Sequence, residues 1–314
     1  MARDRLLIVG ARGFLGANLA MASRHDYQVI AHSSTTPIAV DDIESVVVDL
    51  EPAGAAVELV GRVGADLVVN CAALADVDRC ERDPTLAARL NAEVPGELAA
   101  ACRQAGAGFI HISTDAVFGS GSPPFLTTST PSPVNAYGRS KLDGEQQVLA
   151  AMPGALVART NIVGWSPTGR RSLLEFFHTR LSRGERVAGF TDVVFRPVAA
   201  SDLWPLLHRL STDGTRGIWH ATGCDLISKF DFGVLVASTF GWPVELVEPT
   251  SVAGAGLAAA RSGELDVIPS DVDDPTLALG IIGGLSRLAS LEAAGYRNQL
   301  ATFIDQEATT SWTS

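Results

Sequence analysis

Short, uniformly apolar runs alternate with longer segments of helical periodicity through the first half of the chain. The runs, which we interpret as strands, are 5–9, 27–31, 45–49, 66–70 and 108–113. The helical segments between them are 14–24, 53–62 and 84–105. Strands that are apolar at every position are buried on both faces, as in a parallel sheet covered by helices. The pattern therefore predicts an α/β fold, a Rossmann-type doubly wound parallel sheet.

The pattern loosens after about residue 165. The segments 172–181 and 201–210 keep a helical period, and the run 217–223 predicts a strand that returns to the main sheet. We therefore expect a first domain over residues 1–165 and a smaller C-terminal region over residues 166–314.

The charge and composition narrow the class of protein. The 314 residues carry a net charge of −11 and are 46% hydrophobic. An acidic protein repels phosphate backbones, so nucleic acid is not an expected partner. No apolar run approaches the length of a membrane span. None of the four cysteines stands in a C-x-x-C pair, so we expect reduced thiols, no metal and a soluble cytoplasmic protein.

Three glycines lie between the first predicted strand and the first predicted helix. In "GARGFLG", Gly10, Gly13 and Gly16 enclose Phe14 and Leu15. Glycine allows a close approach of backbone to ligand, and a helix N-terminus attracts a diphosphate. The turn predicts dinucleotide binding by the first domain, with substrate binding mainly in the second region.

The residues around this turn favour NADP(H) over NAD(H). The second strand is followed by Ser33 and Ser34 and by no carboxylate until Asp41, whereas an NAD site usually has an acidic residue there. Arg12 lies inside the turn, where a guanidinium suits a 2′-phosphate.

Tyr137 and Lys141 form an i, i+4 pair and share one face of a predicted helix. An ammonium nearby would lower the pKa of the phenol by up to about 3 units, which suits a proton donor to a carbonyl oxygen. Such a pair also occurs on solvated helices. Here Thr114 follows a predicted strand, where its hydroxyl can bind the same substrate oxygen.

Five segments together resemble the extended short-chain dehydrogenase/reductases: "GARGFLG", 66–81, 113–119, 135–145 and 158–165. The segment "NCAALADVDRCE" and "STD-x-VF" are most similar to the dTDP-4-dehydrorhamnose reductase branch. The resemblance implies a catalytic trio of Thr114, Tyr137 and Lys141, with Tyr137 as proton donor and Lys141 on the nicotinamide ribose. It also implies that the cofactor is lined by Asp49, Leu50, Cys71, Ala72 and Ala73, and that Arg159 and Asn161 lie near the nicotinamide and substrate.

The substrate is expected to be a nucleotide-linked sugar, bound by Thr114, Asp115 and Asn161. Sugar-nucleotide dehydratases of this superfamily carry Thr-Asp-Glu, but here Ala116 replaces the acid/base glutamate. The candidates for the substrate diphosphate are Arg170, Arg171, Arg196 and Arg261. Arg196 ranks first because "FRPV" stands where the reductases show Gly-Ala-Pro-Thr or Gly-Ser-Pro-Thr. His32, His111 and His220 are expected to serve packing or the cofactor rim.

The resulting hypothesis is an NADPH-dependent reductase of a nucleotide-linked 4-keto-6-deoxysugar. One alternative is a non-catalytic NADP-binding subunit similar to the methionine adenosyltransferase regulatory subunit. Another is a sugar-nucleotide 4-epimerase. A homodimer is left open.

Overall fold

A parallel sheet of seven strands forms the centre of the protein. The computed structural model describes residues 3–119, 121–252, 263–270 and 279–304. Within these residues the strand order is β11-β6-β5-β4-β1-β2-β3, and every neighbouring pair is parallel. The strands are β1 (Arg5–Val9), β2 (Gln28–Ser33), β3 (Ile43–Val47), β4 (Leu67–Asn70), β5 (Gly108–Thr114), β6 (Leu156–Thr160) and β11 (Gly217–His220). The predicted doubly wound fold is confirmed.

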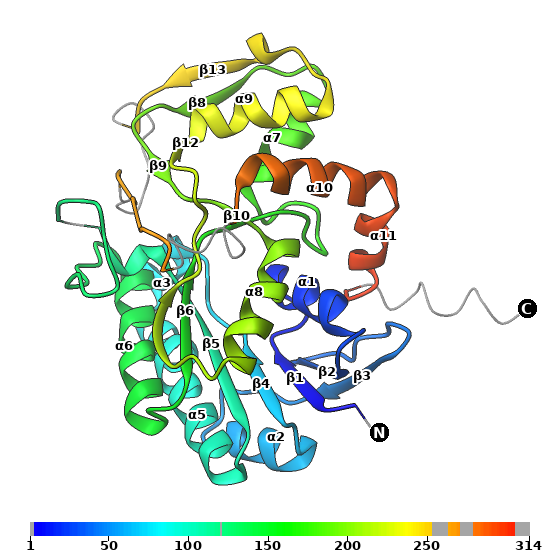
Figure 1. The fold of residues 1–314 in the computed structure, drawn as a ribbon, viewed down its shortest axis with the longest axis vertical. Coiled ribbons are helices and arrows are strands. Elements are labelled where there is room, and N and C mark those ends of the chain that lie inside the picture. Colours follow the sequence, from blue (N-terminus) through cyan, green and yellow to red (C-terminus); the bar gives the residue numbers. More distant parts are fainter. Residues whose placement is uncertain (1–2, 120, 253–262, 271–278, 305–314) are drawn as a thin grey trace, which may run out of the picture.

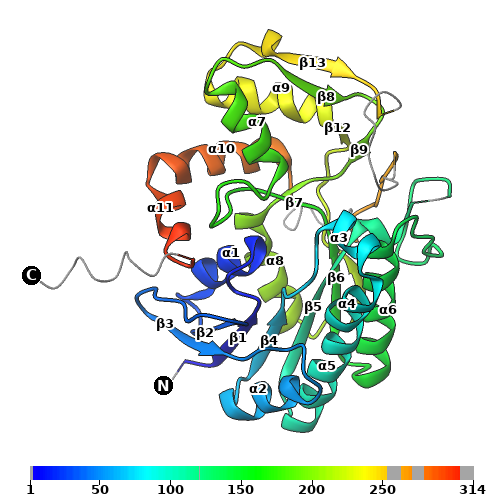
Figure 2. The same ribbon diagram turned by 180° about the vertical axis from the view of Figure 1, so that it is seen from behind.

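Helices cover both faces of this sheet, as Figures 1 and 2 show from opposite sides. Leu6 and Ile8 of β1 belong to the apolar core of one face, and Leu7 and Val9 belong to the core of the other. The first face is covered by α1 (Phe14–Ser23) and α8 (Ala200–Thr212). The second is covered by α2 (Ala55–Val63), α5 (Val94–Ala105) and α6 (Ala136–Ala151). Burial on both faces of the sheet therefore explains why the sequence of β1 is apolar at successive positions.

The predicted helix 84–105 is one helical stretch with an irregular turn inside it. It consists of α4 (Pro84–Ala88), a π-helical turn η1 (Arg89–Glu93) and α5. Short elements flank the sheet edge at α3 (Val77–Arg82) and η2 (Asp115–Val117). The π turn presents the backbone of Asn91 to α6 so closely that a side chain at Gly144 would lie 2.1 Å from the Asn91 carbonyl oxygen. A turn of this kind is frequent near functional sites.

A second part of the molecule lies above the carboxyl edge of the sheet (Figure 1). It contains three pairs of short strands: β7 (Ile162–Val163) with β10 (Val198–Ala199), β8 (Val187–Phe190) with β13 (Val247–Thr250), and β9 (Val194–Phe195) with β12 (Ile227–Ser228). Its helical elements are α7 (Leu173–Leu181), α9 (Lys229–Phe240), η3 (Val244–Leu246), α10 (Ile281–Ala293) and α11 (Tyr296–Ala301). Between these segments, α8 and β11 return to the sheet, and the core of the first face continues from β1 to Leu285 and Leu300.

Asn18 ties α1 to distant parts of the chain. Its buried side chain donates to the Trp165 carbonyl at 2.9 Å and accepts from the Tyr296 hydroxyl at 3.1 Å. Arg12, just before α1, donates to the Ile304 carbonyl at 3.1 Å. The helix that follows the glycine turn is thus fixed by the C-terminal segment of the second part.

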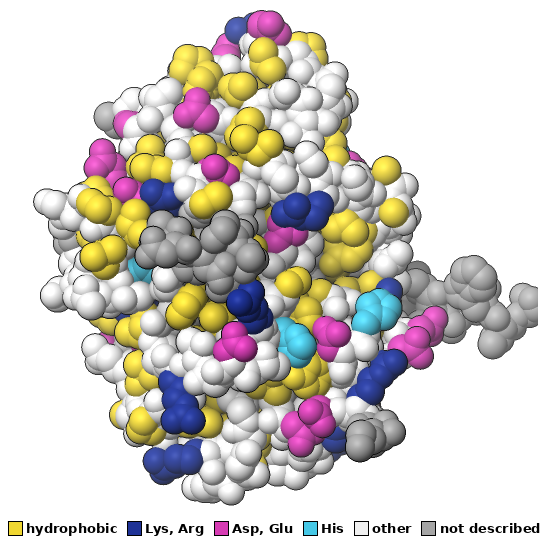
Figure 3. Space-filling view, in the orientation of Figure 1, with side chains coloured by type: hydrophobic (Ala, Val, Ile, Leu, Met, Phe, Trp, Pro, Cys, Tyr) yellow, Lys and Arg dark blue, Asp and Glu magenta, His cyan; other side chains and the backbone are white. Residues whose placement is uncertain are grey.

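The molecular surface is mixed in charge. On the face in Figure 3, acidic and basic side chains of the described residues are interspersed with apolar ones. None of the helices in the described part of the chain has both the length and the hydropathy that a membrane crossing requires.

Candidate active site

Side chains cannot replace Gly10 or Gly16 in the glycine turn unless the backbone moves. Gly10 has a φ of +80°, and a Cβ there would lie 2.7 Å from the backbone nitrogen of Ala72. A Cβ on Gly16 would lie 2.4 Å from the Gly10 carbonyl oxygen. Gly13 is the N-cap of α1 and offers no side chain to the first helical N–H groups, which lack intrahelical acceptors. The turn is therefore a cradle of backbone and N–H groups that fits a dinucleotide diphosphate.

The residues expected at the rim of this cradle, Arg12, Ser33 and Ser34, differ in their hydrogen-bond partners and in their exposure. Arg12 donates to the Thr36 carbonyl at 3.4 Å, so its guanidinium lies against the loop after β2. The buried Ser33 hydroxyl already donates to the same Thr36 carbonyl, whereas Ser34 is exposed. Of the two serines, Ser34 is the one that can face a ligand.

The wall of the cradle comes from the ends of β3 and β4. Asp49 is exposed and accepts from the Glu51 N–H at 3.1 Å, and Leu50 beside it is buried. Cys71 is half-buried, and burial raises the pKa of its thiol to about 12, so it is not a reactive thiolate. Ala72 donates its N–H to the Asn70 side chain, and Ala73 is exposed.

Thr114 and Tyr137 meet at the carboxyl end of β5. Thr114 caps η2 by accepting from the Ala116 N–H at 3.1 Å, and its hydroxyl donates to the Asp115 carboxylate at 3.2 Å. The same hydroxyl is close enough to the phenol of Tyr137 to act on its pKa. Asn135 caps α6 through the Gly138 N–H at 2.8 Å, which starts the helix directly before the tyrosine. These two caps explain why the two hydroxyls come together.

Burial raises the pKa of Tyr137 to about 12, and the negative charge of Asp115 acts in the same direction. The hydrogen bond from Thr114 opposes this rise. The expectation that Lys141 lowers the pKa of Tyr137 is therefore wrong for this structure. The reason is that the Lys141 ammonium is engaged elsewhere and that removing a phenolate from water dominates. Tyr137 is held in its protonated form.

Lys141 is buried on the face of α6 that packs on β5. Its Nζ donates to the Ile112 carbonyl at 2.7 Å and lies 3.2 Å from Nε2 of His111. Burial lowers the pKa of Lys141 to about 8, while the carboxylate of Glu145 opposes that shift. The lysine is thus close to losing its charge near neutral pH.

Asp115 and Asn161 form a second polar pair at the same sheet edge. Asn161 donates to the Asp115 carboxylate at 2.6 Å. Burial raises the pKa of Asp115, while the bonds from Asn161 and Thr114 and the charge of Lys229 counteract it. The predicted substrate residues Thr114, Asp115 and Asn161 are therefore brought together.

The predicted phosphate ligand Arg196 is engaged with protein groups. Its Nε donates to Asp266 at 2.6 Å and its Nη1 donates to the Cys224 carbonyl at 2.5 Å. Binding a phosphate would require this pair to open. Arg261 lies outside the described residues, and no hydrogen bond or ion pair is described for the side chains of Arg170 or Arg171.

A buried ion pair lies directly behind the site. Arg159 donates two hydrogen bonds to the Glu145 carboxylate, from Nε at 2.8 Å and from Nη2 at 2.6 Å. Ser113 donates to the same carboxylate at 2.5 Å. Arg159 is only 1% exposed and joins α6 to β5 and β6, so its guanidinium is occupied by protein groups. His220 accepts from Arg159 at 3.4 Å.

The comparisons with known proteins agree with this geometry. A family model described as the RmlD substrate binding domain matches residues 4–266. This chain belongs to the RmlD substrate binding domain family. The predicted likeness to the dTDP-4-dehydrorhamnose reductase branch of the extended short-chain dehydrogenase/reductases is thereby confirmed.

Two curated relatives and one solved structure illustrate the family. The probable low-salt glycan biosynthesis reductase Agl14 of Haloferax volcanii is 32% identical over 297 residues, covering 91% of this chain and 97% of that protein. The dTDP-4-dehydrorhamnose reductase of Mycobacterium tuberculosis is 37% identical over 267 residues, covering 82% and 83%. The structure of dTDP-4-dehydrorhamnose reductase from Bacillus anthracis, in complex with NADP, is 25% identical, has a TM-score of 0.80 and covers 92% and 99%.

One charged residue of this family member was missed by the sequence reasoning. Lys229, the first residue of α9, lies 5.9 Å from the ring centre of Phe190, and its charge acts on Asp115. The scarcity of lysine in the sequence could have drawn attention to it, because only Lys141 and Lys229 of the 24 Lys and Arg residues are lysines. One lysine thus lies in the predicted catalytic trio, and the charge of the other acts on Asp115.

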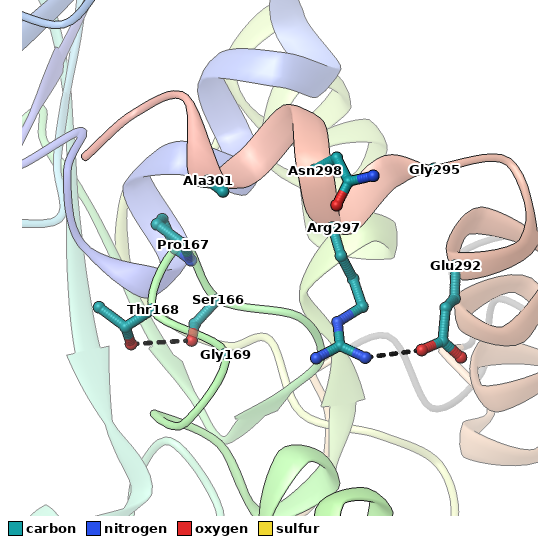
Figure 4. A pocket seen from close by; sticks show the side chains of 9 residues that line it. All are labelled: Ser166, Pro167, Thr168, Gly169, Glu292, Gly295, Arg297, Asn298 and Ala301. Carbon is teal, nitrogen blue, oxygen red and sulfur yellow. Dashed lines mark hydrogen bonds and ion pairs between the residues drawn. The ribbon is translucent and has the colours of Figure 1, made fainter. Parts of the chain in front are cut away.

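A separate hollow lies where the loop after β7 meets α10 and α11 (Figure 4). Its volume is about 380 Å³. Arg297 on its wall pairs with Glu292 at 2.7 Å and lies 4.6 Å from the ring centre of Trp165. The charged groups on its wall, Arg297 and Glu292, are therefore paired with each other.

Proposed function

We propose that this protein is a nicotinamide-dependent reductase of a keto group on a nucleotide-linked sugar. The observation that carries the proposal is the proximity of the Thr114 and Tyr137 hydroxyls at the carboxyl end of β5, on the same sheet edge as the glycine cradle after β1. In open α/β sheets, ligands bind at this edge. Membership of a family whose relatives are named as reductases of a dTDP-linked sugar supports the substrate class.

The residues suit the delivery of one proton. A bound reduced nicotinamide would supply the hydride to the carbonyl carbon. Tyr137, protonated because burial raises its pKa, donates a proton to the carbonyl oxygen, and the Thr114 hydroxyl bonds to the same oxygen. An alkoxide is far more basic than a phenolate, so the transfer is downhill even from a tyrosine with a pKa of about 12.

The cofactor in this proposal is NADP(H) rather than NAD(H). Arg12 and Ser34 lie beside the loop after β2, and no carboxylate lies between that strand and Asp41. A 2′-phosphate would meet a guanidinium there and no competing acid. We assign dinucleotide binding to residues 1–165 together with β11, and substrate binding mainly to residues 166–314.

The substrate in this proposal is a 4-keto-6-deoxysugar. Asp115 and Asn161 offer hydrogen-bonding groups next to Thr114, and the neighbouring Ala116 brings no second acid. Simple carbonyl reduction needs only a hydride and a proton, whereas removal of water needs a further acid/base group.

The test is oxidation of NADPH and NADH with dTDP-, GDP- and UDP-linked keto-sugars. We expect NADPH oxidation with one nucleotide class, and a loss of at least about 100-fold in kcat for Tyr137→Phe with NADPH affinity retained. Tyr27→Phe is the matched control, because Tyr27 packs against Trp204 and His208 away from the site.

Three other outcomes would contradict the proposal or a part of it. NADPH binding without oxidation over the whole panel would favour the non-catalytic subunit. Interconversion of UDP-sugars without added NADPH would favour the epimerase. Near-normal turnover of Tyr137→Phe would remove the tyrosine from its assigned role.

A further inference from the structure

Three buried side chains form a row from the wall of the glycine cradle to Lys141. Asn70 ends β4, His111 lies in β5 and Lys141 lies in α6. Their exposed fractions are 0%, 0% and 2%. Nδ2 of Asn70 lies 3.1 Å from Nδ1 of His111, and Nε2 of His111 lies 3.2 Å from Nζ of Lys141.

The amide of Asn70 has only one orientation that suits its neighbours. Its Oδ1 accepts the Ala72 N–H at 3.1 Å. A flipped amide would place an NH₂ group against that N–H, so two donors would face each other without water. Asn70 therefore directs its NH₂ group to Nδ1 of His111.

This orientation decides where His111 carries its proton. Complete burial and the nearby charge of Lys141 hold the pKa of His111 well below its usual value, so the ring is neutral. A neutral imidazole has one N–H and one acceptor nitrogen. Because Nδ1 accepts from Asn70, the proton is on Nε2 and points to Lys141.

A charged Lys141 cannot accept that hydrogen bond. An ammonium has three donors and no acceptor, so its N–H would face the N–H of His111. A neutral amine satisfies both neighbours: its lone pair accepts from His111, and one N–H donates to the Ile112 carbonyl at 2.7 Å. The other titratable groups that act on Lys141 are Glu145 on α6, whose carboxylate favours the charged form, and Cys71 after β4, whose thiol stays uncharged because burial raises its pKa to about 12.

We propose that His111, oriented by Asn70, is a positioning residue that stabilises the uncharged form of Lys141. Its meaning for turnover rests on the proposed reductase function. In a reductase cycle in which Lys141 gives up a proton, the amine that remains accepts the hydrogen bond from His111.

The test is the titration of Lys141 in wild-type protein and in His111→Gln. Lysine labelled with ¹³C at its ε-carbon gives two NMR signals, because the chain contains only Lys141 and Lys229, and Lys229→Arg identifies them. The glutamine oxygen can accept from an ammonium, so we expect the pKa of Lys141 to rise by about one unit, a tenfold change in its protonation equilibrium. A pKa that stays or falls would overturn the proposal.

His220→Gln is the matched control. His220 is also a buried neutral histidine, but it accepts from Arg159 and not from Lys141. We expect the pKa of Lys141 to be the same in His220→Gln as in the wild-type protein. An equal shift in both variants would mean that His111 has no particular role.

The wild-type protein provides a second measurement if His111→Gln does not fold. The ¹⁵N shifts of the His111 ring report which nitrogen is protonated, and we expect Nε2–H. A proton on Nδ1 would overturn the proposal. Neither measurement uses substrate or cofactor. An inactive protein would therefore contradict the proposed function alone, and an unshifted lysine in an active reductase would contradict this inference alone.

Discussion

The buried pair of Glu145 and Arg159 allows a prediction whose size follows from the structure. Their side chains are 2% and 1% exposed, and two short hydrogen bonds join them. In Arg159→Met the carboxylate keeps only the bond from Ser113. Two bonds to a charged group contribute about 1.5–3 kcal/mol each, and removal of one partner of a buried pair costs about 3–5 kcal/mol. We expect a loss of about 3–5 kcal/mol in the free energy of unfolding.

The assay is urea denaturation followed by circular dichroism, with two comparison variants. Arg186→Met breaks the exposed pair of Arg186 with Glu248, whose side chains are 67% and 47% exposed, and is expected to cost less than about 1 kcal/mol. The double variant Glu145→Gln/Arg159→Met leaves no buried charge at the pair and is expected to be more stable than Arg159→Met. A loss below about 1 kcal/mol in Arg159→Met would refute the reasoning.

Three further predictions concern the cradle and the sheet edge. Gly16→Ala is expected to lower NADPH affinity at least about tenfold in calorimetry, because its Cβ must displace the backbone of the turn. In the control Gly61→Ala the Cβ meets open space, so we expect the free energy of unfolding to stay the same or to rise. Asp115 has a raised pKa, so the folded state binds its proton more tightly and stability falls as pH rises from about 4. Asp115→Asn is expected to remove that fall in pH-dependent thermal unfolding, and an unchanged profile would contradict it. Asn91→Asp is expected to lower the free energy of unfolding by about 2–4 kcal/mol in urea, since it loses donation to the Leu74 carbonyl and to Ser140. A wild-type urea midpoint would refute this.

The strands and helices of the sheet could be predicted because burial on two faces leaves a simple pattern. The run 5–9 coincides with β1, and the segment 14–24 coincides with α1 to within one residue. The helix predicted over 84–105 contains a π turn at Asn91, which periodicity alone does not reveal. The strands β7, β9, β10 and β12 have two residues each, too few for any hydrophobic alternation.

The members of the candidate site were predictable, but their electrostatics were not. Thr114 and Tyr137 follow from their places after a strand and in a helix. The direction of the pKa shift of Tyr137 depends on burial, which the spacing of Tyr137 and Lys141 does not contain. His111 acquires its role from neighbours on β4 and α6, so only the folded chain brings those groups together.

The anchoring of α1 has a consequence for how the nucleotide site is assembled during synthesis. Asn18 is held by Trp165 and Tyr296, and Arg12 by Ile304. A fragment that stops at residue 165 would contain every glycine of the cradle and Trp165, but it would lack Tyr296 and Ile304. The helix that presents its N–H groups to a diphosphate gains the contacts with Tyr296 and Ile304 only after residue 304 has left the ribosome.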